Sequence, residues 1–134
     1  MTVPRNTLSV GGEVTTPPHV LSVGNNPSLM ASRTLILRGA GYLVEEAYTV
    51  DKAINLVAED FIDAMLICHT VPRKGQQILI SAARRKRSLM PILCLRSYDY
   101  ESVPRTCIAV DNDPEALLNA VRKALTPPAP GSIA

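Results

Sequence analysis

The chain has 134 residues, of which 46% are hydrophobic and 4% aromatic, and its formal net charge is +2. This length fits one globular domain with a core of its own. The small net charge and the low aromatic content give no basis for a nucleic-acid partner. No apolar stretch is long enough to span a membrane and the N-terminus lacks a secretory signal pattern, so we expect a cytoplasmic protein without membrane contact.

Residues 1–18 and 126–134 are rich in Thr, Ser, Gly and Pro and are predicted to be flexible tails. Between them, residues 19–125 alternate strand-like apolar runs with helical patterns. This alternation indicates one domain built from βα units around a parallel sheet. Predicted strands cover 19–23, 42–47, 64–68, 91–95 and 107–110, and predicted helices begin near residues 27, 50, 75 and 114.

Capping signals support the ends of these helices. Asn26 precedes Pro27 and Asp113 precedes Pro114, so each helix has an N-cap residue followed by proline in its first turn. The third helix ends in the basic cluster 84–87, where the helix dipole favours positive charge; a solvated helix end is the simplest interpretation, with an anionic partner as the alternative. The first helix shows a broad apolar face made of Leu29, Met30, Arg33, Leu35, Ile36 and Leu37.

The three cysteines match neither a disulfide framework nor a zinc-binding pattern. Cys94 and Cys107 are predicted to be core residues. Cys68 ends an apolar strand at the carboxyl edge, where doubly wound sheets bind ligands. We interpret it as an inert, half-buried thiol, with a redox or covalent centre as the alternative. We expect no cofactor and no metal at Cys68 and His69, because two neighbouring ligands are too few.

Four segments together resemble response-regulator receiver domains of the CheY-like family. They are VLSVGNNP before the first helix, RGAGYLVEEA at the second strand, DAMLICHTVP around Cys68, and DNDPEALLNAV at the last helix. The resemblance covers about residues 19–125. It implies a flavodoxin-like, doubly wound α/β fold with a five-stranded parallel sheet in the order 2-1-3-4-5.

The residues at the family's functional positions differ in chemical type from those that the family uses for phosphorylation. The phosphoacceptor aspartate corresponds to Cys68, and the acidic pair that holds Mg²⁺ corresponds to Gly24 and Asn25. Arg96, with Ser97 beside it as the alternative register, stands at the switch Thr/Ser position, and Val110 or Asp111 stands at the position of the lysine. Magnesium needs hard oxygen ligands, so the resemblance implies a lost or weakened metal site. Changing Gly24 and Asn25 to aspartate is expected to restore some affinity.

Only eleven residues, 96–106, separate the fourth and fifth predicted strands. That is too short for a full crossover helix, so the family's fourth helix is predicted to be reduced or absent. Tyr98 and Tyr100 in this connection, with Leu118 and Arg122 on the last helix, are one candidate interaction surface. The first helix, through Leu29, Arg33 and Ile36, is the other.

These substitutions predict a pseudo-receiver, a non-enzymatic signalling domain of a two-component-type pathway that acts by protein contact without phosphorylation. Its partner would be a signalling protein, and a homodimer is a further expectation. Two alternatives remain open. One is a phosphorelay receiver with an atypical acceptor, and the other is a redox or anion sensor centred on Cys68 and Arg96.

Overall fold

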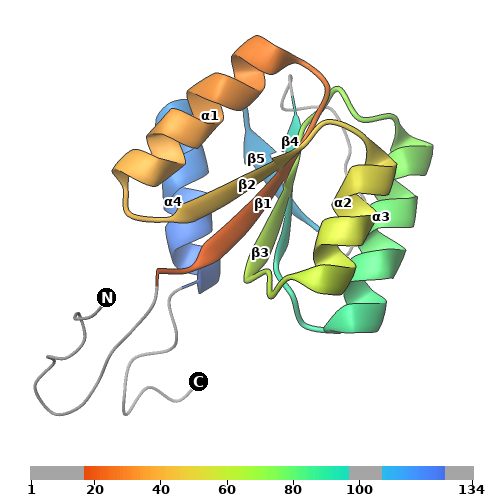
Figure 1. Cartoon of the computed structure of the whole chain (residues 1–134). Helices are drawn as coiled ribbons and strands as arrows, with labels where there is room; N and C mark the ends of the chain where they lie inside the picture. Colours follow the sequence, from red (N-terminus) through yellow and green to blue (C-terminus); the bar gives the residue numbers. More distant parts are fainter. Residues whose placement is uncertain (1–16, 97–106, 126–134) are drawn as a thin grey trace, which may run out of the picture.

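The computed structural model describes residues 17–96 and 107–125, which form an α/β fold with five strands and four helices (Figure 1). The strands are β1 (His19–Val23), β2 (Leu43–Ala47), β3 (Ala64–Ile67), β4 (Ile92–Arg96) and β5 (Ile108–Asp111). The helices are α1 (Pro27–Gly39), α2 (Val50–Glu59), α3 (Arg73–Lys86) and α4 (Pro114–Leu125). Every strand pairing is parallel and the order is β2-β1-β3-β4-β5, which confirms the predicted doubly wound sheet.

The helices form two layers around the sheet. Figure 1 shows α1 and α4 on one face and α2 and α3 on the other. Successive strand residues point to opposite faces, so each face buries its own apolar cluster. The α1–α4 side packs around Val20, Leu66, Leu93 and Val121, and the α2–α3 side around Met65, Ile67, Leu79 and Ile92. Burying each large side chain stabilises the fold by about 1.5–3 kcal/mol.

Helix α1 begins as the sequence predicts, but its buried face differs from the expected apolar face, because it includes Thr34 and leaves out Leu35. The Asn26 side chain accepts a hydrogen bond from the Leu29 backbone N–H at 3.1 Å, and Pro27 occupies the first turn. The buried stripe is Met30, Arg33, Thr34 and Leu37. Leu35, predicted in the apolar face, is 73% exposed. The face that packs against the sheet therefore carries an arginine and a threonine.

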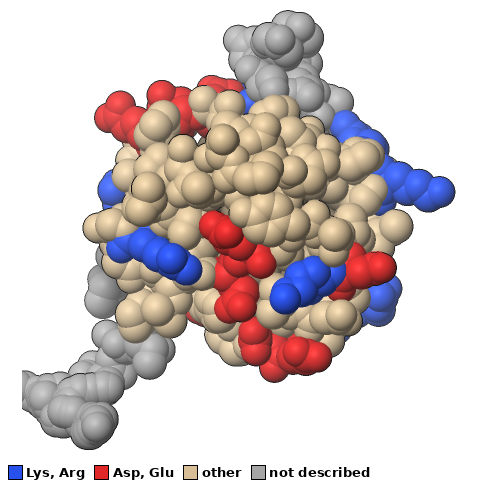
Figure 2. All heavy atoms as spheres, turned by 45° about the horizontal axis from the view of Figure 1, so that its top comes forward, with Lys and Arg blue, Asp and Glu red and all other residues tan. Residues whose placement is uncertain are grey.

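The basic cluster 84–87 lies at the end of α3, as predicted, and ties this helix to its neighbours. Lys86 Nζ donates to the Ala58 carbonyl at 2.7 Å. Arg87 lies over the Phe61 ring, 4.7 Å from its centroid, and donates to the Asp63 carbonyl at 3.3 Å. Lys86 thus contacts the last turn of α2, and Arg87 contacts the loop that follows α2. The face drawn in Figure 2 mixes acidic and basic side chains around a broad area without charge.

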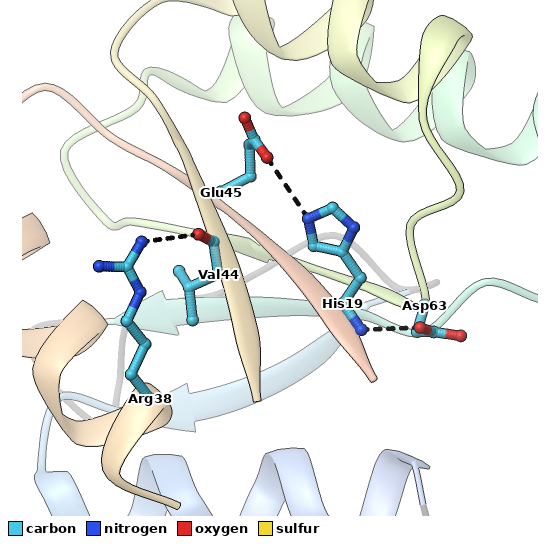
Figure 3. Close-up of polar contacts among 5 residues, drawn as sticks. All are labelled: His19, Arg38, Val44, Glu45 and Asp63. Carbon is cyan, nitrogen blue, oxygen red and sulfur yellow. Dashed lines mark hydrogen bonds and ion pairs between the residues drawn. The ribbon is translucent and has the colours of Figure 1, made fainter. Parts of the chain in front are cut away.

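Polar contacts also fix the amino end of β1, far from the carboxyl edge of the sheet (Figure 3). The His19 backbone N–H donates to Asp63 at 2.7 Å, and the His19 ring lies 3.5 Å from Glu45 on β2. Arg38, in the last turn of α1, donates to the Val44 carbonyl at 3.1 Å. These contacts hold β2 and the segment before β3 against the first strand, so they have a structural role.

Several predictions concern parts of the chain outside the described residues. They are the reduced fourth helix, the loop tyrosines Tyr98 and Tyr100, and nearly all of the two tails, 1–18 and 126–134. Helix α3 begins at Arg73, two residues earlier than expected. Among the helices within 17–96 and 107–125, none is long and apolar enough to cross a membrane.

Candidate functional site

The carboxyl ends of the strands bring the positions singled out by the sequence to one edge of the sheet. Gly24 follows β1 and Cys68 follows β3, while Arg96 and Val110 belong to the ends of β4 and β5. The backbone N–H of Cys68 donates to the Val23 carbonyl at 2.8 Å, and that of Gly24 to the Ala47 carbonyl at 3.1 Å. Gly24 and Cys68 therefore continue the strand pairing and lie against each other.

Gly24 leaves no room for a side chain. A Cβ atom built there would lie 2.7 Å from Cys68 Cβ and 3.0 Å from Met30 Sδ. Positive φ is confined to Gly41 among the described residues, so crowding and not conformation requires glycine at position 24. The expectation that Gly24→Asp would help to restore a metal site does not fit this packing. Asn25, the other position that the resemblance assigns to the acidic pair, is exposed.

Cys68 is more buried than the sequence suggested, with 1% of its surface exposed. The guanidinium of Arg33 donates to its sulfur at 2.9 Å and the Thr70 hydroxyl donates at 3.2 Å. The His69 ring nitrogen Nδ1 lies 3.9 Å from the same sulfur. The thiol is therefore enclosed by hydrogen-bond donors, the strongest of which carries a positive charge.

Arg33 is the residue of this site whose role the sequence did not reveal. It was predicted both in the apolar face of the first helix and in a candidate interaction surface, and it is 5% exposed, so it lies in the buried face of α1. Its Nη1 donates to Cys68, and its Nη2 donates to the Asn112 side-chain oxygen at 2.8 Å. Arg33 thus joins α1 to the loops that follow β3 and β5. The sequence signal for its burial was its helical spacing from Met30 and Leu37, which lie in the same buried stripe of α1.

The environment of Cys68 favours the thiolate. Burial raises the pKa of the Cys68 thiol, but hydrogen bonds from the Thr70 side chain and backbone oppose it, and so do the hydrogen bond and charge of Arg33. The net result is a pKa below the ordinary value of 9.0. With 1% of its surface exposed, however, Cys68 is poorly accessible to reagents, so its interpretation as an inert thiol stays a prediction.

Arg96 faces its neighbouring strand. Its Nε lies 2.9 Å from an Asp111 carboxylate oxygen, directly across the β4–β5 pairing. This exposed ion pair balances the charge of Arg96. Val110 is buried on the α1–α4 side, so this position supplies no cation to the edge. The arginine placed against Cys68 is therefore Arg33, whereas the sensor hypothesis assigned that role to Arg96.

Cys94 and Cys107 differ from Cys68 in their surroundings. Cys94 is fully buried, and Cys107 is partly buried and packs against the same cluster. A hydrogen bond with Cys107, together with burial, raises the pKa of Cys94. The structure thus fits their predicted role as core residues. Throughout residues 17–96 and 107–125, no three His, Cys, Asp or Glu side chains are grouped to hold a metal ion.

The candidate interaction surfaces are only partly formed by exposed side chains. Leu118 of α4 is partly buried and packs against the cluster on the α1–α4 side. Arg122 is exposed and donates to Asn119 at 3.0 Å. On α1, Leu29 and Ile36 are partly exposed and line a cavity. Nothing in the structure tests either surface as an interface, so both stay predictions.

Comparison with solved structures defines the class of fold. The chemotaxis protein CheY4 of Vibrio cholerae matches with a TM-score of 0.70 and 23% identity, over 81% of this chain and 99% of that one. TrrA of Thermotoga maritima, solved in complex with Mg²⁺-BeF, matches with a TM-score of 0.69 and 17% identity, over 81% of this chain and 99% of TrrA. The receiver domain of a Pseudomonas fluorescens HD domain-containing protein matches with a TM-score of 0.71 and 19% identity, over 90% of this chain and 92% of that domain.

The chain therefore has the fold of CheY-like response-regulator receiver domains. No protein-family model matches it, and no curated protein matches its sequence.

Proposed function

We propose that the chain is a pseudo-receiver that acts by protein contact in a two-component-type pathway, without phosphorylation as its trigger and without enzymatic activity. The hydrogen bond between Arg33 and Cys68 carries this proposal. In a receiver that is switched by phosphorylation, a phosphoryl group must enter at the end of β3. Here that strand end carries a thiol and no carboxylate; the thiol is 1% exposed, and its sulfur already accepts a hydrogen bond from Arg33 at 2.9 Å.

The chemistry of the edge supports the same conclusion. Phosphoryl transfer depends on a metal and on fixed cations that stabilise the charge developing on the phosphoryl oxygens. Neither Gly24 nor Asn25 offers a carboxylate, and the packing around Gly24 opposes adding one. TrrA shows that a protein of this fold can hold Mg²⁺. We infer that this chain has lost that capacity and keeps the fold as a frame for binding a signalling protein, or a second copy of itself.

Reaction with a phosphodonor tests the proposal. The protein is incubated with acetyl phosphate and Mg²⁺, and its intact mass is followed over time, with a receiver that bears the aspartate as positive control. We expect no gain in mass, because the acceptor and the metal ligands are both absent. A stable phosphoryl adduct that disappears in Cys68→Ser would instead establish the atypical phosphorelay receiver.

A thiol-based sensor is the second candidate, favoured by the donors around Cys68. The thiolate would attack one oxygen of hydrogen peroxide, breaking the O–O bond; Cys68 becomes a sulfenic acid, and the hydroxide that leaves takes up a proton to become water. Arg96 has no part in this version, since it is paired with Asp111. A gain of one oxygen at Cys68 under mild peroxide, absent at Cys94, would favour the sensor over the pseudo-receiver.

A further inference from the structure

A cavity of about 170 Å³ opens between α1 and the start of α4, on the side of the sheet where Arg33 lies. Its walls are mainly apolar, and its polar groups come from α1 and from the loop before α4. An apolar cavity of roughly 150 Å³ holds a molecule the size of benzene, so this one has room for about seven non-hydrogen atoms. The principal lining residues are Leu29, Arg33, Ile36, Leu95, Asn112 and Leu117.

Arg33 gives this cavity a buried positive charge with unused donors. A guanidinium carries five N–H groups, and only two of those on Arg33 are engaged within the described residues, by Cys68 and Asn112. Neither partner is a carboxylate, the usual partner of a buried arginine, and Cys68 balances the charge of Arg33 only when its thiol is ionised. The side chain is 5% exposed, and Arg33 is one of the residues that line the cavity, so a ligand there would be the molecule next to its remaining donors. Because a buried charge is costly unless it is paired, binding of an anion beside the Arg33 guanidinium is favourable.

The rest of the lining restricts which anion fits. The Asp113 carboxylate accepts the Ala116 backbone N–H at 2.9 Å and is exposed, so it caps α4 at the rim. A highly charged anion would meet this carboxylate and a mostly apolar wall. A ligand with one negative charge and an apolar tail fits this lining better: the charge can pair with the one guanidinium, and the tail can contact Leu29, Ile36 and Leu117.

We propose that this cavity binds a small monocarboxylate with an apolar tail, whose carboxylate is held by the Arg33 guanidinium. The site goes beyond the proposed function, because binding here requires neither the loss of phosphorylation nor a protein partner. Its ligand would lie one side chain away from Cys68, since the same guanidinium contacts the sulfur at 2.9 Å.

Titration with pentanoate, followed by two-dimensional NMR of the whole chain, tests this site. We expect saturable shifts at Asn112 and Leu117. Arg33→Met should weaken binding about tenfold or more, the scale of one lost hydrogen bond to a charged group. Arg38→Met removes the same charge from the same helix outside the cavity and should bind normally. Ser32→Trp blocks the exposed rim while keeping Arg33, so it should also abolish binding even if Arg33→Met fails to fold.

Two matched ligands decide whether the charge and the tail both matter. 1-Pentanol keeps the tail without the charge, and inorganic phosphate supplies charge without a tail. We expect pentanol to bind about tenfold more weakly or worse. The absence of saturable shifts with pentanoate overturns the proposal. Equal binding of pentanol means a cavity that does not use Arg33, and equal binding of phosphate means a simple anion site; either result also overturns it.

Discussion

Gly24→Ala is expected to lower the free energy of unfolding by about 1–3 kcal/mol, the usual cost of forcing extra atoms into a packed site. The added Cβ would lie 2.7 Å from Cys68 Cβ, an atom bonded directly to the backbone that cannot easily move aside. Gly24→Asp should cost at least as much, because it adds a carboxylate at a buried position. Urea unfolding followed by circular dichroism measures both changes.

Gly39→Ala is the matched control for this prediction. Nothing lies within 4 Å of the Cβ it would add, and Gly39 is the last residue of α1 with φ outside the left-handed region. We expect this change to stabilise the protein by about 0.4–1 kcal/mol, because alanine restricts the unfolded chain. If Gly24→Ala were as harmless as Gly39→Ala, the close contact between Gly24 and Cys68 would be wrong.

Arg33→Met is expected to raise the pKa of the Cys68 thiol and to destabilise the fold. The change removes a hydrogen bond and a positive charge that lower this pKa, and leaves burial, which raises it. Losing a buried hydrogen bond to a charged group costs about 1.5–3 kcal/mol. The chemical shift of the Cys68 Cβ carbon, followed against pH, reports the titration directly, and urea unfolding reports the stability.

The same lowered pKa makes stability depend on pH in a definite direction. The thiol pKa of the folded protein lies below 9.0, its ordinary value, so the unfolded state holds the proton more tightly. The free energy of unfolding should therefore rise as pH increases from the folded pKa to the ordinary one, and should lose this contribution as pH falls through the folded pKa. Cys68→Ser should remove this part of the pH dependence.

Arg38→Met provides the control for charge removal. Arg38 lies on the same helix but donates to the Val44 carbonyl, and it makes no contact with the thiol within the described part of the chain. It should leave the Cys68 titration unchanged. A Cys68 titration that is the same in wild type and Arg33→Met would show that Arg33 does not control the thiol.

The fold was predictable because local signals and apolar patterns agree. Asn26 with Pro27, and Asp113 with Pro114, mark two helix starts that the structure reproduces. The run before Cys68 consists of apolar residues without alternation, as expected for a central strand buried on both faces, and β3 is fully buried. Parallel strands then place their carboxyl ends together, so the edge that holds Gly24 and Cys68 could be foreseen.

The presence of Thr34 in place of Leu35 on the buried face of α1 could not be foreseen from hydrophobicity. If residues are ranked by hydrophobicity, Leu35 is expected to be buried, yet the helix buries Arg33 and Thr34 and exposes Leu35. The reason is that both buried polar side chains have hydrogen-bond partners: Arg33 donates to Cys68 and Asn112, and Thr34 donates to Glu46. These partners are 12 to 79 residues away in the sequence, so the spacing within one helix does not reveal them.

The ion pair between Arg96 and Asp111 depends on strand register. Arg96 alone at a strand end suggests a cation for the edge, whereas pairing with β5 places Asp111 directly opposite. Sequence reasoning assigned Val110 or Asp111 to the missing lysine without fixing which residue faces β4. Because a shift of one residue reverses the face of every side chain, the role of Arg96 required the structure.

The most direct test of the pseudo-receiver is the NMR spectrum of the wild-type chain with Mg²⁺ and fluoroberyllate, the species bound in the TrrA structure. We predict that the amide signals of Gly24, Asn25, Cys68 and Asn112 stay unchanged at millimolar Mg²⁺, since a site without carboxylates binds the metal weakly or not at all. Saturable shifts at Gly24, Asn25 and Cys68 that require both Mg²⁺ and fluoroberyllate would contradict the account.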